Sequence, residues 1–138
     1  MLDIIGPLPD SCGMRYLLTI IDRTSRYVDA LPLPEANAAN CCNAFIAQWV
    51  SRWGIPETAT CDNGNTFVSN LWSKLHEQLG TVVNYTPVYH PASLGGLERQ
   101  HRDIKSSLKA VLSHMGDTHG HQWLAALPWV LLGRRTAY

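Results

Sequence analysis

The chain has 138 residues, of which 46% are hydrophobic and 16% are charged, which is enough for one domain with a buried core and too few for two. Its formal net charge is zero at pH 7, so no overall excess of charge points to a polyanionic partner. The four cysteines form no CxxC pair, which argues against a zinc site or a disulfide framework. No signal peptide or long apolar run is present, which predicts an intracellular protein.

The first part of the chain predicts three strands. Residues 2–5 form a short apolar run with Asp3 in its middle, and residues 16–21 and 27–31 read as an antiparallel hairpin because their polar link is short. A carboxylate within such a run is costly to bury unless it is paired, for example with a bound cation. The alternative is an edge strand on which Asp3 points to water. Asp22 lies at the corner of the hairpin, where a side-chain bond to the turn backbone is a sufficient explanation.

The next part predicts a helix followed by a strand. Apolar side chains recur at helical spacing over residues 37–53, and Gly54 supplies a stop. Residues 58–61 form a short strand that delivers Asp62 into the Asn63-Gly64 turn, a pair that tolerates positive φ. A carboxylate at the end of a strand lies at the rim of a sheet, where ligands commonly bind. A turn aspartate that bonds its own backbone is the equally weighted alternative.

Three further elements are predicted after this turn. Residues 70–79 predict a short helix that Gly80 ends, and residues 82–85 predict a strand. The apolar side chains of the short helix are expected to face inward; they are Leu71, Trp72, Leu75 and Leu79. Near the end of the chain, residues 123–132 form an apolar segment that Pro128 interrupts, which predicts a kinked or broken helix.

A long helix is predicted after a loop over residues 86–94, and Gly95 and Gly96 are expected to open it. Its apolar face is expected to consist of Leu97, His101, Ile104, Leu108, Leu112 and Met115. A separate charged stripe contains Glu98 and, at helical spacing, Arg102, Lys105 and Lys109. The alternative is a solvated surface helix with an ordinary ion pair.

Basic residues gather locally on this neutral chain. Residues 99–109 contain four cations against one anion, Asp103, and Arg134 with Arg135 adds a second basic spot. Such a patch fits a partner with phosphates, although a solvated face is as common.

The cysteines and histidines are weaker candidates for ligands. Cys41 and Cys42 read as small apolar fillers of a helix, and the histidine cluster lacks cysteine or carboxylate at ligand spacing; its members are His114, His119 and His121.

The order of the predicted elements indicates an α/β domain with a mixed sheet and helices on its faces. In that arrangement Asp3 lies on a central strand, Asp62 ends a neighbouring strand, and Glu98 lies on a helix that can cross the same sheet. Three acids that converge without a cation would repel one another. With two divalent cations about 3.5 to 4 Å apart they become ligands, and phosphoryl transfer becomes the natural chemistry.

Three motifs in this order resemble the catalytic core of retroviral and retrotransposon integrases. The motifs are LDIIGPLP with Asp3, CDNGNTF with Asp62 and YHPASLGGLERQHRDIK with Glu98, and 35 residues lie between Asp62 and Glu98. The segments IGPLP, IIDRTSRY and LPWVLLGRRTAY resemble gypsy-type elements in particular. The resemblance covers nearly the whole chain, so residues 1–138 are expected to form one catalytic core domain.

The resemblance implies a ribonuclease-H-like fold with a mixed five-stranded sheet, and two Mg²⁺ or Mn²⁺ ions. Asp3 would bridge the ions, while Asp62 and Glu98 would each hold one. The implied reactions are removal of nucleotides from 3′ ends by water, followed by attack of the new 3′ hydroxyl on target DNA. Arg102 and Lys105 match positions that grip element-end DNA, and Lys109 continues their stripe.

The family also implies an active-site loop, partners and a location. The loop corresponds to residues 89–96, in which His90, Ser93, Gly95 and Gly96 are the candidate functional residues. The implied partners are DNA and further copies of the chain, in a homodimer or higher assembly and without a membrane. The implied location is the nucleus, or a virus-like particle or the cytoplasm before integration.

The sequence also departs from the family pattern. Ala92 and Leu94 stand where the family usually has glutamine and a polar residue. The first strand is expected to lack its usual beginning, and the zinc-binding and C-terminal DNA-binding domains are expected to be absent. Two alternatives therefore remain open: a host-retained, catalytically silent remnant that binds nucleic acid or protein, and a DDE-type transposase or ribonuclease H.

Overall fold

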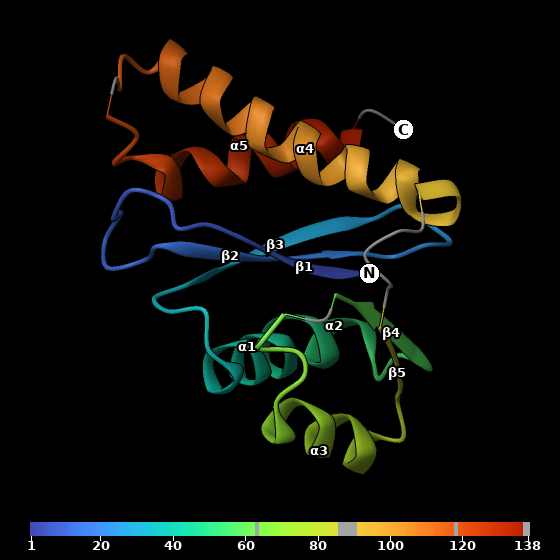
Figure 1. Cartoon of the computed structure of the whole chain (residues 1–138). Coiled ribbons are helices and arrows are strands. Elements are labelled where there is room, and N and C mark those ends of the chain that lie inside the picture. The colour runs from blue at the N-terminus through green and yellow to red at the C-terminus, as the bar shows by residue number, and fades with distance from the viewer. Residues whose placement is uncertain (63, 86–90, 118, 137–138) are drawn as a thin grey trace.

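The computed structural model describes residues 1–62, 64–85, 91–117 and 119–136. Within the helix that begins at Pro91, the side chains of residues 91–98 and 101 fall outside this description. Two helices cover one face of a three-stranded sheet, while the remaining helices and two further strands lie on its other side (Figure 1). Among the described residues, no helix combines the length and apolar character needed to cross a bilayer.

The three-stranded sheet contains β1 (Leu2–Ile5), β2 (Tyr16–Ile21) and β3 (Val28–Leu33) in the order β1-β2-β3. Both pairs are antiparallel, which confirms the predicted hairpin. β3 extends two residues beyond the predicted end and includes Pro32. Because β3 is an edge of this sheet, the missing N–H of Pro32 is tolerated there.

The helical segment after β3 is continuous and consists of α1 (Ala38–Ala44), η1 (Phe45–Val50) and α2 (Ser51–Trp53). The Asn37 side chain caps its start by accepting a hydrogen bond from the Asn40 N–H at 2.9 Å. Gly54 ends it with a φ of +88°, a value that glycine adopts without strain. The predicted helix over residues 37–53 is therefore confirmed.

A second, smaller sheet pairs β4 (Thr58–Cys61) with β5 (Val82–Tyr85) in parallel, and α3 (Asn70–Leu79) connects them. The bounds predicted for these three elements agree with the structure. The α/β class with five strands is confirmed, but the hydrogen-bonded ladder is divided into three strands and two. β1 is thus an edge of its own sheet and lies beside β4, rather than in the centre of one continuous ladder.

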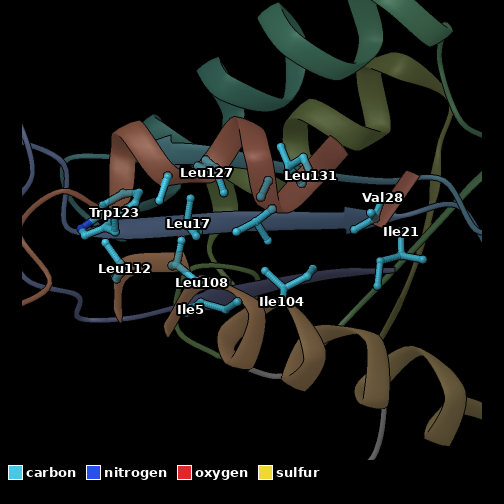
Figure 2. Close-up of a cluster of buried hydrophobic side chains, with 13 residues drawn as sticks. Ile5, Leu17, Ile21, Val28, Ile104, Leu108, Leu112, Trp123, Leu127 and Leu131 are labelled. Carbon is cyan, nitrogen blue, oxygen red and sulfur yellow. The ribbon is translucent and has the colours of Figure 1, made fainter. Parts of the chain in front are cut away.

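The last two helices are α4 (Pro91–His114) and α5 (Trp123–Thr136). They pack on the three-stranded sheet through a buried apolar cluster (Figure 2). In this cluster Ile5 and Leu17 of the sheet meet Ile104 and Leu108 of α4 and Leu127 of α5. The predicted core face of α4 is thus confirmed at its centre.

Three local predictions about the helices were wrong, namely the opening of α4 and the burial of Leu71 and of Met115. α4 begins at Pro91, so Gly95 and Gly96 lie inside it, because proline at the first helical position is preset for the helix. Of the kink or break predicted at Pro128, the break is absent: α5 continues to Thr136, since its buried apolar face offsets the lost backbone bond. Leu71 and Met115 are 50% and 42% exposed, because the buried side of α3 is formed by Trp72 and His76 and because Met115 follows the last residue of α4.

Candidate active site

Asp3 lies on the face of the sheet that α4 covers. Successive side chains of a strand point to opposite faces, and Ile5, two residues after Asp3, packs against Ile104 of α4. The pairing of Asp3 with Thr19 and of Ile5 with Leu17 continues the same face into β2. Asp3 is half-buried, and its Oδ1 accepts a hydrogen bond from the Ile4 N–H at 2.8 Å. The carboxylate is therefore oriented toward the α4 layer and held at one oxygen.

Asp62 directly follows β4 and is exposed. Its Oδ1 accepts a hydrogen bond from the Gly64 N–H at 2.8 Å. Asp62 thus makes the bond to the turn backbone that the sequence analysis gave as its alternative role. The predicted reason for a glycine here was its tolerance of positive φ, but Gly64 is not among the glycines with positive φ. Instead, a Cβ at Gly64 would lie only 2.9 Å from Asp62 Oδ1. Glycine thus leaves room for the Asp62 carboxylate.

The end of β4 lies near the start of β1. Burial raises the pKa of the Cys61 thiol to about 11, and the positive charge of the Met1 amino group opposes this rise. β1 and β4 lie beside each other, and Met1 and Leu2 line the same pocket as Thr58 and Thr60. Asp62 follows Cys61, and Asp3 follows Met1 by two residues, so both acids belong to the same end of the molecule.

Glu98 lies in the first half of α4, six residues before Ile104, which corresponds to about 9 Å along the helix axis. Its side chain lies outside the described residues, so the meeting of all three carboxylates remains a prediction. Among the described side chains, no group of three histidine, cysteine or acidic residues could hold a metal ion. Carboxylate oxygens such as those of Asp3 and Asp62 are nevertheless the donors that Mg²⁺ and Mn²⁺ prefer.

The basic stripe of α4 faces solvent. Arg102, Lys105 and Lys109 are all exposed, and none of them forms a salt bridge with a described side chain. The second basic spot has a different character. Arg134 lies 3.5 Å from the Asp103 carboxylate, and Arg135 lies 3.1 Å from that of Asp29, so both are used within the fold.

The predicted active-site loop, residues 89–96, is not a loop over its second half. Ser93, Gly95 and Gly96 belong to the backbone of α4, because the helix already begins at Pro91. His90 lies outside the described residues. Two glycines within a helix each cost about 1 kcal/mol relative to alanine, which makes the first turns of α4 intrinsically weak.

Asp22 and two members of the histidine cluster, His119 and His121, make contacts within the fold. Asp22 Oδ2 accepts hydrogen bonds from the Ser25 hydroxyl at 2.5 Å and the Ser25 N–H at 3.0 Å, and these bonds hold the pKa of Asp22 below its usual value. The predicted turn role is confirmed. His121 Nδ1 lies 3.1 Å from the Asp10 carbonyl oxygen, and its ring centroid lies 6.3 Å from that of His119.

Two positioning contacts were not found from the sequence. The Thr19 hydroxyl donates to the Asp3 carbonyl oxygen at 3.1 Å, and the Tyr85 hydroxyl donates to the Phe67 carbonyl oxygen at 2.7 Å. The second contact ties the end of β5 to the segment that follows Asp62. The only features of the sequence that could have indicated these two contacts were a threonine within an otherwise apolar strand and a tyrosine at the end of a strand. Neither feature is specific for such a contact.

Comparisons with known proteins identify similar domains. Residues 2–91 match the family described as "Integrase core domain". The Gag-Pol polyproteins of Koala retrovirus and Gibbon ape leukemia virus are each 35% identical over 127 residues, which is 92% of this chain and 7% of either polyprotein. The chain therefore spans a small part of these relatives. The crystal structure of the catalytic core domain of BIV integrase is 26% identical, with a TM-score of 0.70 over 95% of this chain and 78% of that one.

Proposed function

Since the chain belongs to the integrase core domain family, a family of polynucleotidyl transferases, we propose that it processes 3′ ends of retroelement DNA and transfers them to target DNA. One observation carries the proposal. Asp3 faces the layer formed by α4, which contains Glu98, while Asp62 directly follows β4, the strand that lies beside β1. This arrangement supports one site built from β1, β4 and α4. A catalytically silent remnant is not favoured by the comparisons.

Asp3, Asp62 and Glu98 would together hold two divalent ions, because carboxylate oxygens are the donors that Mg²⁺ and Mn²⁺ prefer. Such ions, when bound, lower the pKa of the attacking water or hydroxyl and stabilise the leaving oxygen. The backbone of this chain prepares two of the acids. The Ile4 N–H holds one oxygen of Asp3, and the Gly64 N–H holds one oxygen of Asp62. These bonds fix the carboxylates before DNA arrives, which is the role of supporting contacts at a metal site.

The exposed cations of α4 are proposed to hold the DNA backbone. Arg102, Lys105 and Lys109 follow Glu98 along the helix, so phosphates bound there would lie in line with the acids. Phosphate contacts of this kind position the duplex and carry no sequence information. Replacing any one of the three cations with a neutral residue is expected to reduce the dependence of DNA affinity on salt concentration.

Oligomerisation is proposed to use the outer face of α5. Trp129 and Leu132 of this helix are 67% and 52% exposed. Integrases oligomerise, and two large apolar side chains one turn apart suit a face shared between copies. The proposed location of the reaction is a separate point: it is the nucleus, where the target DNA resides.

The test is a disintegration assay, in which a fluorescent branched DNA is resolved in the presence of Mn²⁺. The unchanged chain is compared with Glu98→Gln and with Glu77→Gln, which makes the same substitution at an exposed position of α3. The proposal predicts loss of the signal in Glu98→Gln and retention in Glu77→Gln. Equal signals from all three proteins would contradict it.

A further inference from the structure

A groove of 620 Å³ lies between α4 and the segment that joins β1 to β2. Its floor is apolar. Beneath it lie the buried core side chains of Ile5, Leu17, Leu108 and Leu112, which Figure 2 shows pointing toward one another, while the accessible apolar surface includes Pro7, Leu8 and Pro9. The volume lies within the range of about 300 to 1,000 Å³ that is usual for ligand sites. Asp3 and Asp62, the two acids of the proposed active site whose side chains the structure describes, do not line it.

One wall of the groove is held in place by hydrogen bonds. The Trp123 Nε1–H donates to the Pro9 carbonyl oxygen at 2.5 Å, and the Leu8 N–H donates to the Arg15 carbonyl oxygen at 2.7 Å. Pro7 and Pro9 are exposed along this wall and restrict its backbone. The groove is therefore preformed, which lowers the entropic cost of filling it.

The opposite wall carries unpaired positive charge. Lys105 and Lys109 line the groove, are exposed, and form no salt bridge with a described side chain. Asp117 also lines it, but its two oxygens accept backbone N–H bonds from His119, Gly120 and Gln122. Desolvation acts to raise the pKa of Asp117, yet these backbone bonds together hold it below its usual value. Asp117 therefore stays ionised, but Lys105 and Lys109 outnumber this one carboxylate, so the net charge of the three side chains at this edge is positive.

The shape selects among anionic ligands. The lining residues of α4 run from Ile104 to Ser113, which corresponds to about 14 Å along the helix. A DNA backbone would use the two ammonium groups but would leave the apolar floor empty. An elongated ligand with aliphatic side chains on one face and carboxylates about one helical turn apart would satisfy both features.

We propose that this groove binds an acidic amphipathic peptide segment of a partner protein, with its aliphatic side chains on the apolar floor and its carboxylates on Lys105 and Lys109. Duplex DNA could compete for the same lysines, which would couple partner binding to DNA binding. The inference does not depend on metal binding or catalysis, so its failure would leave the proposed function untouched.

Three labelled helical peptides test the proposal by fluorescence anisotropy in the absence of metal. The first has leucines on one face and glutamates along its flank, the second replaces glutamate with lysine, and the third replaces leucine with alanine. The proposal predicts that the first peptide binds at least about tenfold more tightly than either control. Equal binding of the leucine and alanine acidic peptides would reduce the site to a nonspecific cation patch and overturn it.

Variants of the chain locate the binding. Ser113→Trp fills the mouth of the groove and is expected to weaken binding of the first peptide at least about tenfold, whereas Ser106→Trp, an exposed position of α4 outside the groove, is expected to leave it unchanged. The double variant Lys105→Glu/Lys109→Glu is expected to lose the acidic peptide and to bind the lysine peptide instead. Equal effects of the two tryptophan variants, or no exchange of peptide preference, would refute the assignment.

Discussion

The Arg135 guanidinium donates a hydrogen bond to the Asp29 carboxylate at 3.1 Å. Its Nε–H also donates to the Val28 carbonyl oxygen at 3.1 Å, and the group lies 4.6 Å from the centroid of the Tyr27 ring. Asp29 is 5% exposed, so its charge is removed from water and depends on this partner. The pair thereby ties the end of α5 to β3, which was not evident from two adjacent arginines in the sequence.

Substitution Arg135→Ala is expected to lower the free energy of unfolding by about 2 to 4 kcal/mol, because it leaves the buried Asp29 carboxylate without its cation. Arg134→Ala provides the matched control. Its partner Asp103 is 46% exposed at a distance of 3.5 Å, so a loss of only about 0 to 1 kcal/mol is expected. Urea unfolding of both variants measures the difference, and equal losses would show that Arg135 is an ordinary surface residue.

His76 is expected to make stability depend on pH. It is fully buried, and burial lowers its pKa below the ordinary value of 6.5, although the bond between Nδ1 and the Trp72 carbonyl oxygen opposes this. The unfolded chain therefore takes up a proton near pH 6.5 that the folded chain does not, and stability falls as the pH drops below this value.

The slope from one such histidine is at most about 1.4 kcal/mol per pH unit, and it ends below the lowered pKa of the folded state. Thermal unfolding between about pH 7.5 and 5.5, a range that brackets the ordinary histidine pKa, is expected to show a smaller decrease for His76→Leu than for the unchanged chain. His114→Leu, at an exposed position, should keep the full decrease. An unchanged pH dependence in His76→Leu would exclude this histidine as the source.

Only Cys12 is expected to react quickly with a thiol reagent in the folded protein. It is exposed, whereas Cys41, Cys42 and Cys61 are buried. Burial raises the pKa of Cys41 to about 12 and that of Cys61 to about 11, so few thiolates form at neutral pH. Mass spectrometry after brief alkylation should find one modified site, and none in Cys12→Ser. Rapid modification of Cys41 would contradict the packing of α1.

Gly64→Ala is expected to reduce disintegration activity by at least about tenfold while leaving the melting temperature nearly unchanged. The added Cβ would lie 2.9 Å from Asp62 Oδ1 and would displace the carboxylate in an exposed turn. Gly133→Ala is the control, because no atom lies within 4 Å of its Cβ and the helix gains from alanine. Full activity in Gly64→Ala would separate Asp62 from the reaction.

Local sequence patterns predicted most elements of this fold. The bounds of β1, β2, β4 and α3 agree with the structure, because each apolar run is short and is bounded by glycine, proline or polar turn residues. The start of α4 was wrong because Gly95 and Gly96 were taken as its opening, whereas Pro91 already sets a helical backbone. The division of the strands into two ladders depends on long-range pairing, which no local pattern encodes.

The candidate site could be predicted in part. Because side chains alternate along a strand, the sequence predicts that Asp3 points to the opposite face from Leu2 and Ile4. It does not predict which of the two faces α4 covers, which is known only from the packing of Ile5 against Ile104. The turn bond of Asp62 was foreseen as an alternative, while the steric role of Gly64 was not. Glu98 was identified by the resemblance of its motif, and of its interval from Asp62, to the integrase family, and the position of its side chain remains a prediction.

The central claim is that Asp3, Asp62 and Glu98 hold divalent ions together. A crystal soaked in Mn²⁺ tests it most directly, since manganese can be located by its anomalous scattering. The account predicts manganese bound by carboxylate oxygens of all three residues in the unchanged chain, and a lost or weakened peak in Glu98→Gln. Well-ordered Asp3, Asp62 and Glu98 side chains that point apart, with manganese elsewhere, would contradict it.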